Sequence, residues 1–352
     1  MNGALMDRVL RVVVIDDSAY VRKVVREILS RSPFVEVVGT ARDGLEALDL
    51  VERLDPDVVT CDLIMPELDG VGFVREQMQR RPVPIIIMSI ANETAEAALT
   101  ALDAGAIDFV QKPTALASEK IFEVSTELIE KVKAAGAISL NRMPVPPVVP
   151  VAVTPGTKVS GNHSVDLVVI GISTGGPQAL KRLIPQFPKD FPAPIVMVMH
   201  MPIGYTEMYA AKLNEQSTLE VREAAAGDEI KAGRVLLAPA GRHITFIQEA
   251  NGKIVTHLDA RPFNTLHKPS VDVLFQSAAE VYGNRVLGVV MTGMGSDGKQ
   301  GAAWIKSQGG LIFTEAESSC VVYGMPSVVV EAGLSDQSVA LEDMAHAIME
   351  VV

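Results

Sequence analysis

The stretch "DLVVIGISTGGPQALKRLI", residues Asp166 to Ile184, changes from one periodicity to another within a few residues. Its first half is a continuous apolar run, as in a strand buried on both faces of a sheet. Its second half has apolar residues at helical spacing, with Pro177 in the first turn, where proline is favoured. Gly175 and Gly176 allow a tight turn between the halves. The stretch therefore predicts a strand that leads directly into a helix, the repeating unit of an α/β fold.

The same alternation of strands and helices continues on both sides of this stretch. Residues 8–136 contain five short apolar runs separated by helix-period segments. Because right-handed crossovers leave few topologies, we expect a flavodoxin-like fold with a parallel five-stranded sheet in the order 2-1-3-4-5. Residues 165–352 repeat the alternation with new strands and helices. There we expect a Rossmann-like, doubly wound α/β domain with an added β-hairpin around Arg242 to Leu258.

The chain length agrees with two domains rather than one. A core seldom grows beyond about 250–300 residues, and this chain has 352. Between the two α/β patterns, residues 137–164 are rich in Pro and Gly and follow neither the helical nor the strand period. This composition predicts a semi-stiff interdomain linker. The expected organisation is one domain over residues 8–136, the linker, and a second domain over residues 165–352.

Composition and charge exclude several classes of protein. The formal net charge of −12 argues against a nucleic-acid partner, which requires clustered Lys and Arg. No apolar run is long enough to predict a membrane-spanning helix, so we expect no direct membrane insertion. The N-terminus lacks a signal-peptide pattern, and the two cysteines, Cys61 and Cys320, fall in different predicted domains. These features favour a cytoplasmic protein without disulfides.

Polar residues follow the predicted strands of the first domain. Asp16 and Asp17 come after its first strand, Asp62 after the third, and Ser89 and Lys112 close the fourth and fifth. The carboxyl ends of parallel strands share one crevice, so these side chains are expected to meet. Three carboxylates around one point favour Mg²⁺, and a carboxylate beside a metal and a lysine can accept a phosphoryl group. Taken singly, an Asp at a strand end is more often a helix cap or a turn residue than a ligand.

In the second domain, Ser173, His200 and Asp297 also follow predicted strands. A serine nucleophile needs a base within hydrogen-bond reach and a carboxylate that orients the base. These three residues supply those roles, although each also has a structural alternative as a helix cap, a core histidine or a turn residue. His267, in a loop before a helix, can border the same site.

The motif Gly171-x-Ser173-x-Gly175 satisfies the nucleophile-elbow pattern of α/β-hydrolases. However, that fold orders its triad as Ser, acid, His, whereas the order here is Ser, His, acid. A phosphate-binding loop is also disfavoured, because the turn lacks G-x-G-x-x-G and a Walker lysine. The motif therefore marks a candidate nucleophile in another type of hydrolase.

The first domain resembles a two-component receiver domain in the segments "VVVIDDSAYVRKVV", "DVVTCDLIMPELDG", "IIIMSI" and "DFVQKP". The resemblance implies that Asp62 is phosphorylated and that Mg²⁺ is held by Asp16, Asp17, Asp62 and the backbone carbonyl of Ile64. It also implies a switch formed by Ser89, Phe109 and Lys112. Ser89 replaces the more common Thr and keeps the hydroxyl, whereas Phe109 lacks the hydroxyl of the frequent Tyr.

The second domain resembles the catalytic domain of chemotaxis protein-glutamate methylesterases. The resemblance rests on "VVIGISTGGP", "VMVMHMPIGYTEMYAAKLN", "VLLAPAGRHI", "KPSVDVLF" and "VVMTGMGSDGKQGA". It implies a Ser173–His200–Asp297 triad with the backbone N–H of Met294 as oxyanion donor. We expect the backbone N–H of Thr174 to be a second donor on structural grounds.

The combined resemblance implies hydrolysis of glutamate γ-methyl esters on methyl-accepting chemotaxis receptors, with release of methanol and activation by phosphorylation. Deamidation of receptor glutamines can follow the same acyl-transfer chemistry. A histidine kinase is the implied phosphodonor, and the esterase reaction needs no cofactor. The alternative is a response regulator whose second domain only binds a partner protein. Substitution of Ser173 distinguishes the two, because only the enzyme requires that hydroxyl.

Overall fold

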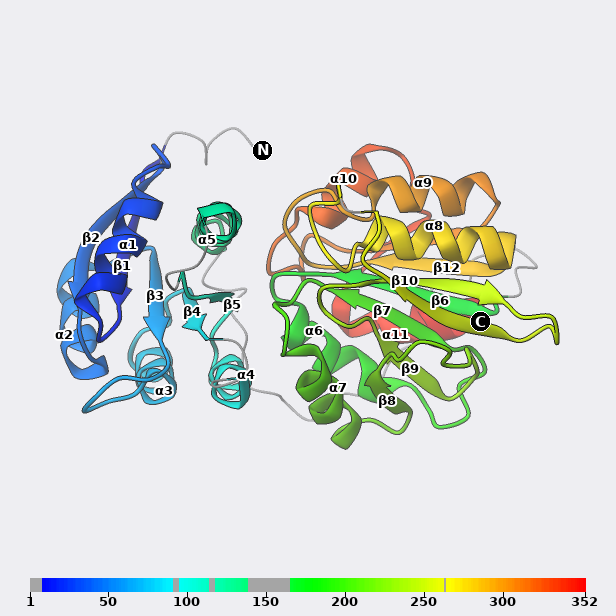
Figure 1. Cartoon of the computed structure of the whole chain (residues 1–352), viewed down its shortest axis with the longest axis horizontal. Helices are drawn as coiled ribbons and strands as arrows, with labels where there is room; N and C mark the ends of the chain where they lie inside the picture. The colour runs from blue at the N-terminus through cyan, green and yellow to red at the C-terminus, as the bar shows by residue number, and fades with distance from the viewer. Residues whose placement is uncertain (1–7, 91–94, 114–117, 139–164, 263) are drawn as a thin grey trace. The chain divides into compact units, whose positions relative to one another are not determined.

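The computed structural model describes residues 8–90, 95–113, 118–138, 165–262 and 264–352. The chain divides into two compact units, Met1–Val148 and Val149–Val352. The units are blue to cyan and green to red in Figure 1. Most of the predicted linker, residues 139–164, lies outside the described residues. Each unit is described by itself below.

The first unit is built on a five-stranded parallel sheet in the order β2-β1-β3-β4-β5. This is the order predicted for a flavodoxin-like fold. Its strands are β1 (Leu10–Ile15), β2 (Val35–Ala41), β3 (Val58–Asp62), β4 (Ile85–Ser89) and β5 (Asp108–Gln111). The helices are α1 (Ala19–Leu29), α2 (Gly44–Leu54), α3 (Gly70–Arg80), α4 (Ala95–Asp103) and α5 (Ser118–Gly136).

Short polar side chains begin three helices of this unit close to the carboxyl edge of the sheet. Ser18 caps α1, Asp43 caps α2 and Asp69 caps α3, each accepting a backbone N–H from the first turn. Such caps satisfy amides that have no partner within the helix. The loops between strand ends and caps are thereby kept short, and they carry the predicted acidic residues.

The second unit contains a seven-stranded sheet in the order β14-β13-β12-β6-β7-β9-β8, and all of its paired strands are parallel. The strands are β6 (Leu167–Ile172), β7 (Ile195–Met199), β8 (Glu220–Glu223), β9 (Arg234–Leu237), β12 (Val286–Val290), β13 (Leu311–Glu315) and β14 (Gln337–Val339). Chain order reverses between β6 and β12, which makes their carboxyl ends the topological switch point. Ligands bind at such points in open α/β sheets.

Helices cover both faces of this sheet (Figure 1). One layer contains α8 (Val271–Tyr282), α9 (Lys299–Ser307) and α10 (Met325–Glu331), and the other contains α6 (Gly176–Leu183), α7 (Thr206–Glu215) and α11 (Leu341–Val351). Short 3₁₀ turns, η2 (Ile184–Gln186) and η3 (Gly283–Arg285), follow α6 and α8. The doubly wound prediction is confirmed. None of the described helices combines the length and apolar character needed to cross a bilayer.

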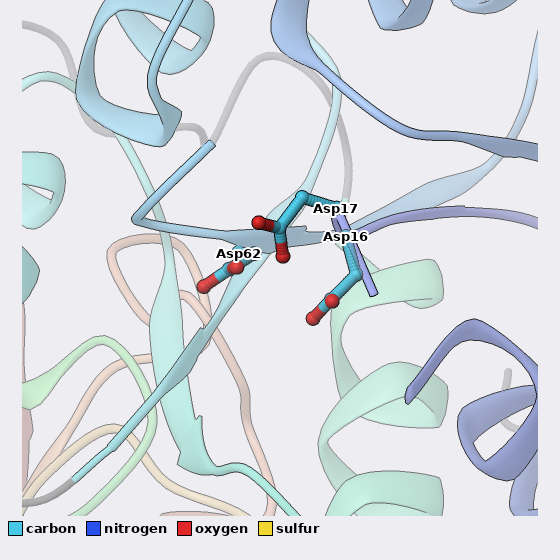
Figure 2. Close-up of side chains that lie close together, drawn as sticks. All are labelled: Asp16, Asp17 and Asp62. Atoms are coloured by element: carbon cyan, nitrogen blue, oxygen red, sulfur yellow. The ribbon is translucent and has the colours of Figure 1, made fainter. Parts of the chain in front are cut away.

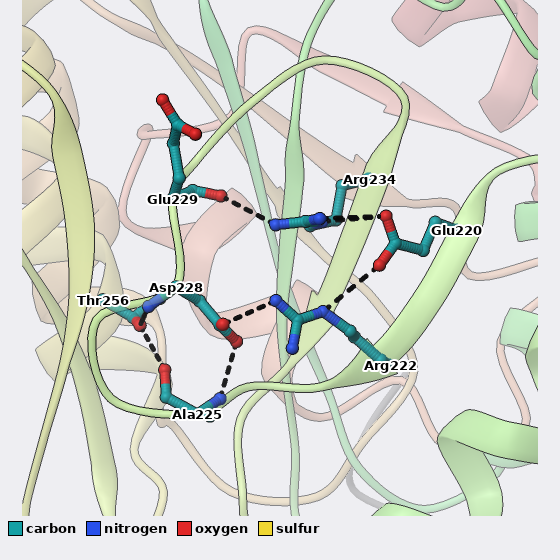
Figure 3. A network of polar contacts seen from close by, with 7 residues as sticks. All are labelled: Glu220, Arg222, Ala225, Asp228, Glu229, Arg234 and Thr256. Carbon is teal, nitrogen blue, oxygen red and sulfur yellow. Dashed lines mark hydrogen bonds and ion pairs between the residues drawn. The ribbon is translucent and has the colours of Figure 1, made fainter.

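The predicted hairpin is an antiparallel pair, β10 (His243–Gln248) and β11 (Ile254–Asp259). It packs on α8, outside the main sheet. Polar contacts join the loop after edge strand β8 to this hairpin (Figure 3). Arg222 donates to Asp228 at 2.5 Å, and the Asp228 backbone N–H donates to Thr256 Oγ1 at 3.0 Å. On the other side, Arg234 of β9 donates to Glu220 of β8 at 3.0 Å.

Sequence patterns missed three short elements, β8, β14 and α10. Strand β8 reads "EVRE" and buries only Val221, while β14 has three residues. Four-residue and three-residue strands contain too few positions to establish a period of two. Their pairing with β9 and β13 comes from contacts between segments distant in the sequence.

Candidate functional site

Strand register brings Ser173 and His200 to the same place. In the β6–β7 ladder, Ile172 pairs with Met199, so Ser173 and His200 are the next residues of adjacent strands. Neighbouring strands lie about 4.8 Å apart. The backbone N–H of His200 also donates to the Ile172 carbonyl at 3.2 Å. Ser173 and His200 therefore lie side by side in the backbone, each directly after the end of one of two neighbouring strands.

Asp297 reaches the same edge from the loop after β12, the neighbour of β6 on its other side. Its Oδ2 lies 2.8 Å from Nε2 of His200. Because the carboxylate accepts from that nitrogen, Nδ1 is the nitrogen available to accept a proton. Nδ1 is buried, and among the described residues it has no hydrogen-bond partner. In the same part of the chain, no hydrogen bond joins Ser173 Oγ to His200.

Asp297 is held by the N-terminus of α8. Its Oδ1 accepts from the Ser270 hydroxyl at 2.8 Å and from the Asp272 N–H at 2.9 Å, while Oδ2 accepts from the Val271 N–H at 2.8 Å. Burial would raise the pKa of this carboxyl, but His200 and the backbone amides outweigh it and hold the pKa well below its usual range. Asp297 is thus a fixed anion with its charge directed at His200.

Asp272 forms the reciprocal contact. Its Oδ1 accepts from the backbone N–H groups of Gly298 at 2.9 Å and Gly301 at 2.7 Å, at the start of α9. Burial, with the charge of Asp297 as a further cause, raises the pKa of Asp272 to about 6. Each of the two helix N-termini is therefore bound by a carboxylate from the segment that begins the other helix, which fixes the loop that carries Asp297.

A second histidine lies against the candidate base. The ring of His267 stacks on that of His200, with centroids 3.9 Å apart and an interplanar angle of 19°. This contact restrains the plane of the His200 imidazole. It confirms that the loop before α8 borders the site.

The turn after β6 presents Ser173. Gly175 has a φ of 81°, a left-handed conformation that favours glycine, and the Gly176 N–H donates to the Ser173 carbonyl at 2.7 Å. The Ser173 N–H donates to the Thr292 carbonyl at 2.9 Å. The backbone of Gly293, in the loop after β12, lies so close to Ser173 that a Cβ on residue 293 would be 2.8 Å from the Ser173 Cβ. Glycine is required here by the close approach of two strand ends.

The two predicted oxyanion donors flank this contact. Thr174 follows Ser173, and its carbonyl accepts from the Thr292 hydroxyl at 2.9 Å. Met294 follows Gly293 and is half-buried. Within the part of the chain that the structure describes, its backbone N–H has no acceptor. The turn after β6 and the loop after β12 therefore place both backbone segments beside the serine.

In the first unit, the predicted acidic residues also converge (Figure 2). Ligand oxygens of Asp16, Asp17 and Asp62 lie within 4.8 Å of one another, with Asp16 and Asp62 buried and Asp17 exposed. Three carboxylates and one open side form the oxygen-rich donor set that Mg²⁺ prefers. The residues present fit a divalent cation, which would relieve their mutual repulsion.

Lys112 extends from the end of β5 into the same cluster. Its Nζ lies 2.7 Å from Asp62 Oδ2 and 2.9 Å from Asp16 Oδ2. Its backbone N–H donates to the Ser89 carbonyl at 2.8 Å, which joins the ends of β5 and β4. Burial raises the pKa of Asp62, while the hydrogen bond and charge of Lys112 oppose the rise.

Two further predicted residues lie on the chain segments that carry Asp62 and Lys112. Ile64 follows Asp62 by two residues, is exposed, and donates its N–H to Asp62 Oδ1 at 3.3 Å. Phe109 is buried in β5, with the Lys131 ammonium 5.7 Å from its ring centroid. Lys131 also donates to the Phe109 carbonyl at 2.8 Å. The aromatic side chain is thus tied to α5 in this structure.

The sequence did not predict the further residues that hydrogen-bond Asp297 and the loops around Ser173. Ser270 precedes an apolar helical pattern, a position typical of an N-cap, and this signal could have identified it. Asp272 and Glu315 carried no signal, because their partners are backbone amides of other segments. Glu315 accepts the Thr292 N–H at 2.9 Å.

Family models match both units. The CheB methylesterase model matches residues 168–348, and the response regulator receiver domain model matches residues 12–123. The first covers the strand ends that carry Ser173, His200 and Asp297, and the second covers the acidic cluster.

Whole-chain relatives agree with these matches. A protein-glutamate methylesterase/protein-glutamine glutaminase of Myxococcus xanthus is 49% identical, covering 95% of this chain and 96% of the relative. Another, from Symbiobacterium thermophilum, is 44% identical over 99% of this chain and 98% of its own. The Thermotoga maritima CheB methylesterase catalytic domain superposes with a TM-score of 0.52 and 42% identity, covering 54% of this chain and all of that domain. The chain therefore belongs to the CheB methylesterase family and carries a response regulator receiver domain ahead of its methylesterase domain.

Proposed function

We propose that this protein hydrolyses glutamate γ-methyl esters on methyl-accepting chemotaxis receptors and releases methanol. The observation that carries the proposal is the 2.8 Å contact between Asp297 and Nε2 of His200, which leaves Nδ1 to act as the base on the strand next to that of Ser173. The relatives named above are also glutaminases, and we extend the proposal to deamidation of receptor glutamines. Restoring a receptor carboxylate opposes methylation and serves sensory adaptation.

In the proposed mechanism, Nδ1 of His200 takes the proton from Ser173 Oγ as the oxygen attacks the ester carbonyl. The negative charge of Asp297 stabilises the imidazolium that forms, and the contact with His200, together with the α8 amides, holds the pKa of this carboxyl low. Backbone N–H groups of Met294 and Thr174 stabilise the oxyanion. His200 returns the proton to methoxide, methanol leaves, and the glutamyl ester of Ser173 remains. Water activated by His200 then hydrolyses this acyl-enzyme.

Deamidation follows the same steps with a different leaving group. His200 protonates the amide nitrogen, ammonia leaves, and the same glutamyl ester forms on Ser173. Both substrates give a receptor glutamate as the product. The proposed chemistry needs only a nucleophile, a base, a carboxylate and oxyanion donors, so no cofactor is assigned to it.

The receiver unit is proposed to control this reaction. Asp62 accepts a phosphoryl group from a histidine kinase, with Asp16, Asp17, Asp62 and the Ile64 carbonyl as the residues that would hold Mg²⁺. The cation supplies charge that neutralises the entering phosphoryl group. Lys112 contributes a second positive charge at Asp62.

A change at the acidic cluster must reach the rest of the receiver for this control to work. Ser89, Phe109 and Lys112 are the proposed switch residues: Ser89 ends β4, Phe109 lies within β5, and Lys112 directly follows β5. We assign residues 8–136 to the receiver, 137–164 to the linker and 165–352 to the methylesterase domain. We place the reaction in the cytoplasm, where the kinase and the receptor signalling regions meet the enzyme.

The test is a methanol-release assay on membranes that contain methylated receptors. We expect release by the wild type and none above background for Ser173→Ala. Ser217→Ala is the matched control, because Ser217 is a half-buried serine at the end of α7 whose hydroxyl donates to the Leu213 carbonyl. If Ser173→Ala releases methanol at the wild-type rate, the proposed chemistry is wrong and the second domain has a binding role only.

A further inference from the structure

Glu315 is a buried carboxyl that the proposed mechanism does not use. It ends β13 and has no solvent exposure. None of the ion pairs among the described residues includes it. Burial raises the pKa of this carboxyl, and the charge of Glu342 adds to the effect. Burying a carboxyl costs free energy of folding unless the group is hydrogen-bonded.

Its two oxygens hold two different segments. Oε2 accepts the Thr292 N–H at 2.9 Å, and Oε1 accepts the Ser319 hydroxyl at 3.0 Å. The β12–β13 ladder ends at the pair Val290 and Thr314. The Glu315 side chain therefore provides the acceptor for Thr292 beyond the point where the strands pair.

Thr292 in turn supports the nucleophile turn. Its carbonyl accepts the Ser173 N–H at 2.9 Å, and its hydroxyl donates to the Thr174 carbonyl at 2.9 Å. The same hydroxyl accepts the Val322 N–H at 3.0 Å. Every polar group of Thr292 named here is thus bound, and two of them bind the turn that carries the serine.

The next two residues lead to the proposed oxyanion donor. Gly293 lies against Ser173, and its carbonyl accepts N–H groups of Gly324 at 3.1 Å and Met325 at 2.8 Å. Met294 follows. Thr292 is hydrogen-bonded to Ser173 and precedes Met294 by two residues in the chain. A shift of Thr292 would therefore change the position of Ser173 relative to the Met294 amide.

We propose that Glu315 is a positioning residue for the hydrolytic reaction: through Thr292 it fixes the Ser173 turn relative to the Met294 amide. It touches neither the substrate nor the reacting atoms. The inference rests on the proposed function and adds a residue to that site. Transition-state stabilisation depends on placement to within about 1 Å, so loss of this support lowers kcat more than it raises KM.

The test compares Glu315→Leu with Glu315→Gln in the full chain. Leu leaves the Thr292 N–H buried without an acceptor, and we expect kcat for methanol release to fall about 10- to 100-fold with KM nearly unchanged. Gln keeps an acceptor for Thr292 and a group that can bond to Ser319, and it should retain kcat within about threefold. Equal kcat for Leu and the wild type would overturn the proposal.

A matched control separates positioning from stability. Asp336 also accepts a backbone N–H of β13, that of Ile312 at 2.8 Å, but at the opposite end of the strand from Ser173. Asp336→Ala should lower the thermal midpoint and leave kcat unchanged. If it lowers kcat as much as Glu315→Leu does, the effect of Glu315 is one of general stability and the proposal fails.

A double-mutant cycle keeps the proposal testable if Glu315→Leu unfolds in part. Thr292→Val removes the hydroxyl that binds Thr174, and kcat is measured per folded molecule for the single and double variants. We expect the double variant to lose less than the product of the two single losses, since both residues act on one turn. Independent, multiplicative losses would contradict the proposal. If wild type and Ser173→Ala are both inactive, the proposed function fails, whatever the Glu315 variants do.

Discussion

Asp62 and Asp297 both lie at the carboxyl edge of an α/β sheet, yet their surroundings shift their pKa values in opposite directions. Asp62 is the last residue of β3, and Asp297 lies in the loop after β12. Burial raises the pKa of Asp62, even with Lys112 at 2.7 Å. The pKa of Asp297 is lowered despite burial. The hydrogen-bond and charge partners of each carboxylate account for the opposite directions of the two pKa shifts.

Asp62 shares its pocket with two other carboxylates, and the charge of Asp16 adds to the rise in its pKa. Its position suits a group that gains a cation and a phosphoryl group. Asp297 accepts two amides and a hydroxyl at the start of α8, in addition to His200. His200 is the largest cause that lowers the pKa of Asp297, and the two amides add to its effect. The carboxyl edge of one fold type thus raises the pKa of one carboxyl and lowers that of another, according to the groups that the loops place around each.

The largest expected effect follows from removing the anion. Asp297→Asn keeps the size of the side chain but removes the charge that stabilises the His200 imidazolium. We expect kcat to fall by about 10⁴-fold, measured as methanol release at saturating substrate. Asp190→Asn is the control, because Asp190 is exposed on a turn of the same domain. A loss of less than tenfold would show that Asp297 is not the required anion.

The second prediction concerns Asp62 as the proposed phosphoryl acceptor. Asp62→Asn removes the carboxylate that is proposed to be phosphorylated, so the ratio of rates with and without a phosphodonor should fall to unity. For the wild type we expect a ratio of about 5 to 150, the usual range of coupling between sites. Asp49→Asn, on the exposed side of α2, should behave as the wild type. Stimulation that survives in Asp62→Asn would exclude Asp62 as the acceptor.

The third prediction tests how Asp297 is held. Ser270→Ala removes one of its hydrogen-bond donors, the hydroxyl at 2.8 Å. A hydrogen bond to a charged group contributes about 1.5–3 kcal/mol, so we expect kcat to fall roughly tenfold while the two amides keep the carboxylate ionised. Thr, which retains a hydroxyl, should restore most of the rate. A Ser270→Thr variant as impaired as Ser270→Ala would argue against this role.

The smallest effect concerns stability and pH. Glu315 resembles Asp62 in that burial raises its pKa, so the folded state binds its proton more tightly than the unfolded state does. Stability is then lost as pH rises from the unfolded value, about 4.3, to the folded pKa. Glu315→Gln cannot ionise and avoids this loss.

The thermal midpoint of Glu315→Gln should therefore exceed that of the wild type by an amount that grows with pH across this window and then levels off. A difference of 1 kcal/mol corresponds to about 2–4 °C for a domain of this size. Fluorescence of Trp304, the one tryptophan of the sequence, reports on the second unit. A difference that is constant with pH would show that Glu315 ionises equally in both states.

The sequence predicted the fold to a large extent because buried parallel strands and amphipathic helices have distinct periods. The strand order of the first sheet, the doubly wound second sheet and the hairpin near Arg242 to Leu258 were all predicted correctly. The short polar strand β8 was not, since its pairing with β9 and the contacts of Arg222 and Arg234 depend on residues brought together by folding.

For the candidate sites, the sequence predicted which chemical groups lie at or beyond the strand ends: Ser173, His200 and Asp297 in one domain, and Asp16, Asp17, Asp62 and Lys112 in the other. A strand end is marked by local pattern, and parallel strands place all such ends on one edge. Only the tertiary structure decided which imidazole nitrogen Asp297 binds, which helix amides hold that carboxylate, and that Glu315 supports Thr292. These contacts join backbone groups of distant segments, and a backbone N–H has the same identity at almost every position in a sequence. Its partner is set by the packing of the folded chain.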